Sequence, residues 1–132
     1  MSIKSRLTRL AADEDVRQVI LNADVDDLAE ALGDVLHTTV EVYDDAWTMA
    51  HACVVTENGQ TWQEAPSDEF RAAAYEFFEE NGINANARYV VEVSSTAAYN
   101  VYSCIDGDAL VNTVTKLAGD NLPALLATLK RS

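Results

Sequence analysis

Negative charge is concentrated in one part of this sequence, and this constrains the fold more than any other feature. Residues 13–80 hold 18 Asp and Glu residues against two arginines, residues 1–12 hold three bases, and residues 81–132 hold four acids and four bases. The sum, +3 − 16 + 0, gives the net charge of −13. Elements in the acidic part must keep their carboxylates solvated, because burying an unpaired charge is costly.

The composition predicts one domain over residues 1–132. Hydrophobic residues make up 48% of the chain, which at this length is enough for a core without a metal or disulfide. No apolar run approaches the ~18 residues of a membrane span, and the N-terminus lacks the apolar stretch of a signal peptide. We therefore expect a cytoplasmic protein. Its two cysteines, Cys53 and Cys104, either form one disulfide or remain reduced, and reduced thiols are commoner in such a chain.

The spacing of apolar residues predicts an acidic helix that Asp24 opens as its N-cap. Its apolar positions follow the 3.6-residue period at Val25, Leu28, Leu32, Val35 and Leu36. Asp27, Glu30 and Asp34 fall on the other face, where neighbouring carboxylates are roughly 5–6 Å apart. A shorter helix, capped by Asp13, is expected before it, through Leu21.

A second acidic helix is predicted over residues 68–81, with Ser67 as its N-cap and Gly82 just past its end. Glu76, Glu79 and Glu80 lie toward its C-terminus, where acidic charge opposes the helix dipole at ~0.3–1 kcal/mol each in low salt. A local preference broken in this way is typical of a functional surface. Alternatively, these glutamates are solvated and screened at physiological salt, so that their position costs almost nothing and has no functional meaning.

Residues 38–65 allow two structures. The β-branched residues from Thr38 to Val42 favour a strand, and Asn58-Gly59 favours a hairpin that pairs 47–56 with 61–65. Alternatively, apolar residues at helical spacing favour a helix from Val42 to about Ala52.

The C-terminal third predicts a hairpin over about 88–105 and two helices. Residues 88–93 alternate as a strand, a second strand spans about 98–105, and Asp106-Gly107 forms a turn. Asp108 is expected to cap a helix over 109–118, and Pro123 to begin a last helix that ends at Lys130-Arg131. The predicted fold class is therefore α+β, with acidic helices in the N-terminal two-thirds packed against a small antiparallel sheet and C-terminal helices.

No motif points to catalysis, and we expect no enzymatic activity, no cofactor and no metal site. His51-Ala52-Cys53 is the nearest approach to a nucleophile or zinc motif, but it lacks CxxC spacing and further ligands. A small enzyme that uses Cys53 and His51 stays an alternative.

The stretch 24–45, which reads DVDDLAEALGDVLHTTVEVYDD, and the later AxxYE in RAAAYEFF carry a resemblance. Over about residues 24–80 the chain resembles small acidic phage proteins that mimic DNA, the anti-restriction proteins of the overcome-classical-restriction type. This resemblance implies an anti-defence inhibitor, anti-restriction or anti-CRISPR, that acts in the cytoplasm of the host cell. Such an inhibitor occupies a basic nucleic-acid-binding groove.

The charge itself argues against direct binding to nucleic acid or an anionic membrane and favours a basic protein surface as partner. A homodimer is left open. Trp47 and Trp62 are expected in the core, with one of them as an alternative anchor for the partner. The predicted partner-binding residues are Asp24, Asp26, Asp27, Glu30, Asp34, Glu41, Asp44, Asp45, Glu57, Glu64, Asp68, Glu69, Glu76, Glu79, Glu80, Trp47 and Trp62.

Charge density sets a condition on this hypothesis. Duplex DNA carries one charge per ~1.7 Å of axis, whereas the eight acids of 24–45, if helical throughout, would extend over ~30 Å. Mimicry would therefore need helix 68–81 beside the first acidic helix. The alternatives are a salt-adapted domain, whose surface should be acidic all round, and a phage structural or assembly subunit.

Overall fold

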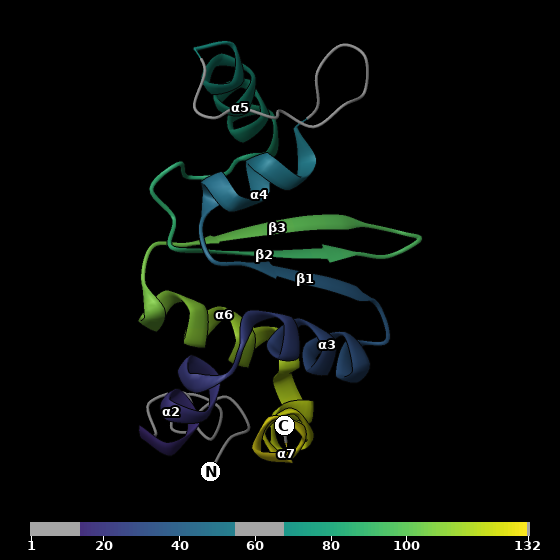
Figure 1. Ribbon diagram of the computed structural model, residues 1–132. Helices are drawn as coiled ribbons and strands as arrows, with labels where there is room; N and C mark the ends of the chain where they lie inside the picture. The colour runs from purple at the N-terminus through teal and green to yellow at the C-terminus, as the bar shows by residue number, and fades with distance from the viewer. Residues whose placement is uncertain (1–13, 55–67, 132) are drawn as a thin grey trace.

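The computed structural model describes residues 14–54 and 68–131, and it has an α+β fold (Figure 1). Its elements, in chain order, are α2 (Glu14–Asn22), α3 (Val25–Leu36), β1 (Thr39–Tyr43), α4 (Ala46–Cys53), α5 (Asp68–Asn81), β2 (Tyr89–Ser94), β3 (Tyr99–Cys104), α6 (Gly107–Ala118), the 3-10 turn η1 (Gly119–Asn121) and α7 (Leu122–Arg131). The predicted α+β class is confirmed, as are the hairpin and the C-terminal helices.

The three strands form an antiparallel sheet in the order β1-β2-β3. The hairpin β2–β3 pairs Tyr89 with Cys104 at one end and Ser94 with Tyr99 at the other. β1 adds to the open side of β2 and pairs Val42 with Val91. Its β-branched residues suit this position, because branched side chains pack well on a pleated surface.

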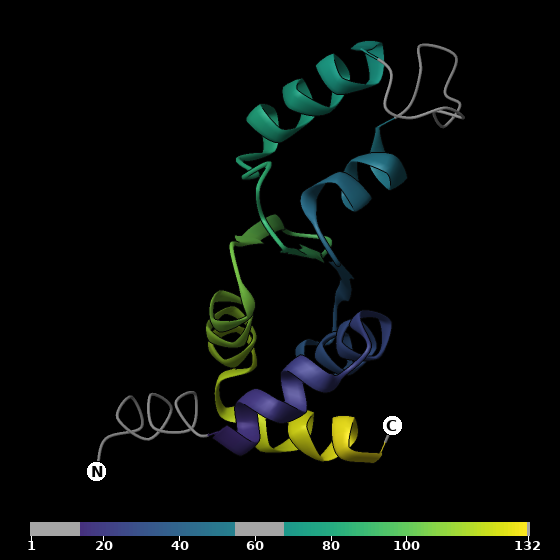
Figure 2. The same ribbon diagram turned by 60° about the vertical axis from the view of Figure 1, so that its left-hand side comes forward.

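Helices cover both faces of the sheet (Figures 1 and 2). On one face, α2, α3, α6 and α7 bury a core with Val40, Val42, Val91 and Cys104 of the strands. On the other face, α4 and α5 bury a second core with Val90. Successive strand residues point to opposite faces, so neighbours such as Val90 and Val91 contribute to different cores.

The ambiguous segment 38–54 is partly strand and partly helix. Thr39–Tyr43 is β1, as the β-branched residues predict. The helix begins at Ala46 and not at Val42, because the Asp45 side chain caps it by accepting the Thr48 N–H at 2.6 Å. The prediction of a hairpin whose first strand spans 47–56 is therefore wrong, because residues 47–53 belong to helix α4. The expected turn at Asn58-Gly59 lies outside the described residues.

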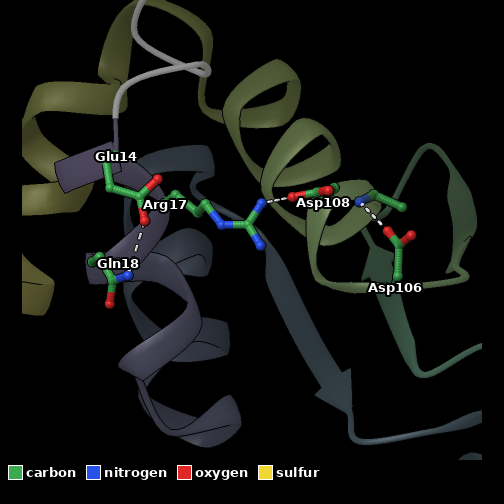
Figure 3. A network of polar contacts seen from close by, with 6 residues as sticks. Glu14, Arg17, Gln18, Asp106 and Asp108 are labelled. Atoms are coloured by element: carbon green, nitrogen blue, oxygen red, sulfur yellow. Dashed lines mark hydrogen bonds and ion pairs between the residues drawn. The ribbon is translucent and has the colours of Figure 1, made fainter.

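Aspartate caps also begin α3 and α6. Asp24 accepts the Asp26 N–H at 2.9 Å, as expected. The expectation that Asp108 caps the next helix is wrong, because Asp106 accepts the Ala109 N–H at 2.9 Å and α6 begins at Gly107. Asp108 instead lies in the first turn and forms an ion pair with Arg17 of α2 (Figure 3). The pair joins two helices on the same side of the sheet.

The predicted helix 68–81 is confirmed, including its end at Gly82. This residue has φ +66°, a left-handed conformation that glycine adopts without strain. Its N–H donates to Glu79 O at 3.4 Å, and the Ile83 N–H donates to Phe78 O at 2.8 Å. Both bonds satisfy carbonyls of the last turn. The caps predicted at Asp13 and Ser67 lie outside the described residues.

Gly33 lets α3 lie close to the chain that leads into β1. A Cβ atom at this position would come within 2.9 Å of the Thr38 carbonyl oxygen. The Thr38 N–H donates to Gly33 O at 3.1 Å, after His37 ends α3 in a left-handed conformation. The chain therefore reverses tightly, and β1 runs back along α3 (Figure 1).

Candidate functional site

The carboxylates of α3 form a ridge that faces away from the core. Asp26, Asp27, Glu30 and Asp34 are all exposed, and the helix buries its opposite side through Leu28, Ala29, Ala31 and Leu32. Within the described residues, no ion pair reaches this ridge. Lys130 of α7 lines the same surface depression as Asp24 and Asp27.

After the reversal at Gly33 the chain returns along α3, and the remaining acids of 24–45 lie on β1 and at the start of α4. Glu41 is exposed on β1, Asp44 is exposed, and Asp45 is half-buried as the α4 cap. We call the eight carboxylates of this segment the acidic edge: Asp24, Asp26, Asp27, Glu30, Asp34, Glu41, Asp44 and Asp45. No lysine or arginine occurs in the sequence between Arg17 and Arg71.

The structure does not bring the second acidic helix to this edge. α5 packs with α4 against one face of the sheet, and α3 packs against the other (Figure 2). The α5 acids are exposed there, and they are Asp68, Glu69, Glu76, Glu79 and Glu80. The condition that both acidic helices lie side by side is therefore not met, because each helix buries its apolar side in a different core.

Trp47 lies among aromatic rings between α4 and α5 and is half-buried. Its ring contacts Phe78 edge-on with centroids 5.2 Å apart, and Tyr75 edge-on at 5.4 Å. This packing is the core position expected for Trp47. Tyr75 is 56% exposed and presents the outer edge of the cluster. Three predicted partner-binding residues lie outside the described residues: Glu57, Glu64 and Trp62.

A shallow groove of about 520 Å³ lies where the C-terminal half of α3 meets the first residues of β1. Ala29 and Gly33 of α3 contribute its apolar part, and Thr39 and Val40 of β1 its other wall. Glu30 and Asp34 of the acidic edge line it as well. This groove thus combines carboxylates of α3 with the start of an outer strand.

Two residues on the sheet extend the candidate surface beyond the sequence prediction. Glu92 of β2 lies directly across from Glu41 in the antiparallel ladder. Tyr99 of β3, which is 49% exposed, donates its hydroxyl to Glu92 Oε2 at 2.6 Å. The alternation within 88–105 places both side chains on one face of the hairpin, but only the register with β1 reveals the Glu41–Glu92 pair.

Cys53 does not form a catalytic pair with His51. Its Sγ lies 3.9 Å from the Tyr43 hydroxyl, whereas the His51 ring stacks on Phe70 at 4.4 Å. Burial raises the pKa of the Cys53 thiol, and Glu92 and Glu41 add to this despite the contact with Tyr43. A thiol held protonated is a poor nucleophile. Cys53 and Cys104 are free and lie in the separate cores on the two sides of the sheet.

Among residues 14–54 and 68–131, no three His, Cys, Asp or Glu side chains are grouped so that they could hold a metal ion. In the same part of the chain, no helix has the length and apolar character to cross a membrane. No known protein family, curated protein or solved structure shows significant similarity to this chain. Function must therefore be inferred from the surface itself.

Proposed function

We propose that this chain is an acidic protein-binding inhibitor whose acidic edge occupies a basic nucleic-acid-binding groove of another protein. An anti-defence role of the phage type, anti-restriction or anti-CRISPR, is the form that the sequence resemblance favours. The observation that carries the proposal is that eight carboxylates lie on the consecutive elements α3, β1 and the start of α4, a segment that contains no lysine or arginine.

The charge density of this edge is closer to that of DNA than the linear sequence indicates. α3 has 12 residues and so spans ~18 Å, and β1 runs back along it. The segment that returns along α3 shares this length, so the acids of 24–45 are spread over less than the ~30 Å of one continuous helix, although Glu41 points to the face of the sheet opposite α3. The reversal at Gly33 raises the density without any contribution from α5.

The helices that pack beside α3 on the same side of the sheet support a directed role for this charge. Residues 107–131, which form α6, η1 and α7, hold two acids and three bases: Asp108, Asp120, Lys116, Lys130 and Arg131. If the acids served only solubility, we would expect residues 107–131 to be as acidic as residues 24–45. A strongly negative edge beside a near-neutral side orients the molecule toward a cationic surface and speeds the encounter.

Two variants with equal net charge test the proposal. The edge variant carries Asp26→Asn, Asp27→Asn, Glu30→Gln and Asp34→Asn, and it leaves both helix caps intact. The control variant carries Asp68→Asn, Glu69→Gln, Glu79→Gln and Glu80→Gln on α5. Each changes the net charge from −13 to −9 by removing four acids.

The three immobilised proteins are exposed to bacterial lysate at low and high salt, and bound proteins are eluted with duplex DNA and identified. We expect the wild type and the control variant to retain a nucleic-acid-binding protein that DNA releases, and the edge variant to lose it. The captured protein should also lose DNA binding when wild type is added. Equal losses in both variants, or a captured protein that DNA does not release, would contradict the proposal.

The α5 carboxylates favour a second candidate, a salt-adapted or assembly domain whose acids serve solubility. They lie on the other side of the sheet, away from the acidic edge. In that case both four-residue variants should lower solubility to the same extent, and neither should change the capture of a specific protein.

A further inference from the structure

We infer that the groove where α3 meets β1 holds an extended basic segment of a partner protein, which adds to the sheet as a fourth strand. This mode of binding rests on the proposed function, since it specifies how a basic partner is held at the acidic edge. Three features of the edge carry it: an outer strand, a groove beside that strand, and carboxylates toward both faces of the sheet.

β1 is an outer strand of the described sheet and pairs only with β2. An outer strand directs half of its backbone N–H and C=O groups away from its neighbour, and these groups can pair with an added strand. Natural proteins often block such an edge with lysine, proline or a bulge. β1 reads Thr-Val-Glu-Val-Tyr, contains no lysine or proline and pairs with β2 without a bulge, so its one charged side chain, Glu41, is what guards this short edge.

The groove places the carboxylates of α3 next to this edge. Glu30 and Asp34 line it together with Thr39 and Val40 of β1. Gly33 lines it as well, and its lack of a side chain lets α3 lie close to the Thr38 carbonyl oxygen. A strand beside β1 would therefore have Glu30 and Asp34 within reach of its side chains on that face.

The other face of the same edge is also acidic. The side chains of a strand alternate between the two faces of a sheet. Val40 and Val42 point to the core beside α3, so Glu41 points to the opposite face, with Glu92 next to it on β2. Lysine or arginine on either face of the added strand thus meets carboxylates, whereas an acidic strand is repelled on both.

This charge pattern selects a partner over a second copy of the chain. Glu41 is the central residue of β1. Two β1 strands paired antiparallel about their centres would place the two Glu41 side chains opposite each other, which is destabilising. Repulsion between the two Glu41 side chains therefore disfavours a dimer through β1, whereas a basic strand would be attracted to the same edge.

A synthetic peptide of alternating lysine and valine serves as the probe, and its binding is measured by NMR at low salt. Two further peptides carry N-methyl groups on alternate residues, one along each backbone edge, so that charge is kept while pairing is blocked. We expect the parent peptide to bind and to protect amides of β1 from hydrogen exchange. One N-methylated peptide should bind at least about tenfold more weakly, and the other about as well as the parent.

Paired variants locate the site. Glu30→Gln with Asp34→Asn should weaken binding of the parent peptide about fivefold, while Glu79→Gln with Glu80→Gln on α5 should leave it nearly unchanged. No binding of the parent peptide, or unchanged protection of β1, overturns strand addition. If both N-methylated peptides bind like the parent while the groove variant still weakens binding, strand addition fails and the acidic-edge proposal stands. A concentration-dependent dimer through β1, seen by sedimentation, would assign the edge to a second copy instead.

Discussion

Glu41 and Glu92 face each other across the β1–β2 ladder, so two carboxylates occupy directly opposed positions on one face of the sheet. Like charges in this arrangement destabilise a sheet. The Tyr99 hydroxyl donates to Glu92 Oε2 and satisfies one of the two carboxylates. Glu41 has no such hydrogen bond among the described residues. The sheet therefore retains an unfavourable charge at the edge where we propose that a basic partner binds.

Removing the Glu41 charge should stabilise the free protein. We expect Glu41→Gln to raise the free energy of unfolding by about 0.5 kcal/mol at neutral pH and low salt, because it ends the repulsion with Glu92. Urea denaturation at low and high salt measures the change, which should shrink as salt screens the pair. A destabilised Glu41→Gln variant would show that Glu41 has a favourable partner. The same substitution should weaken binding of the lysine–valine peptide.

Asp44 and Asp45 are adjacent but should differ in their effect on stability. Asp45 Oδ1 accepts the Thr48 N–H and begins α4, whereas Asp44 is exposed and makes no such contact with residues 14–54 or 68–131. We expect Asp45→Ala to cost about 1 kcal/mol and Asp44→Ala to stay within about 0.5 kcal/mol of wild type. Urea denaturation of the two variants provides the comparison. Asp45→Asn, which keeps a capping oxygen, should recover most of the loss, and equal effects at both positions would argue against the cap.

The ion pair between Arg17 and Asp108 should contribute little to stability. The two side chains are 40% and 66% exposed, so water and salt screen their attraction (Figure 3). A double-mutant cycle with Arg17→Gln and Asp108→Asn should give a coupling energy of about 0.2–1 kcal/mol at low salt. The coupling should decline in high salt. A coupling energy that salt leaves unchanged would indicate a more buried contact.

Alkaline pH should destabilise the protein through Tyr43 and Cys53. Burial raises the pKa of the Tyr43 hydroxyl, and the neighbouring charges of Cys53, Glu92 and Glu41 raise it further. Burial likewise raises the pKa of the Cys53 thiol. Because the folded state binds these protons more tightly, their contribution is complete below the unfolded thiol pKa of about 8.5 and is lost as the pH rises above it.

Urea midpoints from neutral pH to pH 10 should therefore fall at the alkaline end. The double variant Tyr43→Phe with Cys53→Ala should show a smaller fall than the wild type, because it lacks both titrating groups. Identical pH dependence in the two proteins would rule out this pair as the source. Alkylation of Cys53 by iodoacetamide at neutral pH should also be slower than that of a free cysteine.

The sequence by itself determined the local elements and their ends. The period of Leu28 and Leu32 predicted α3, Asp24 predicted its cap, and Gly82 predicted the end of α5. The alternation after Arg88 predicted the β2–β3 hairpin. These features depend on hydrogen bonds and side-chain contacts within a few residues, so neighbouring residues are sufficient to specify them.

Only the tertiary structure decided where the carboxylates lie relative to one another. α3 and α5 both have one apolar side, and nothing in their spacing specifies which face of the sheet each covers. The sequence also did not predict that β1 pairs with β2, and so it did not predict the Glu41–Glu92 pair or the groove at Gly33. Packing between distant segments selects these arrangements, because the apolar faces must be buried together in a way that satisfies the whole chain.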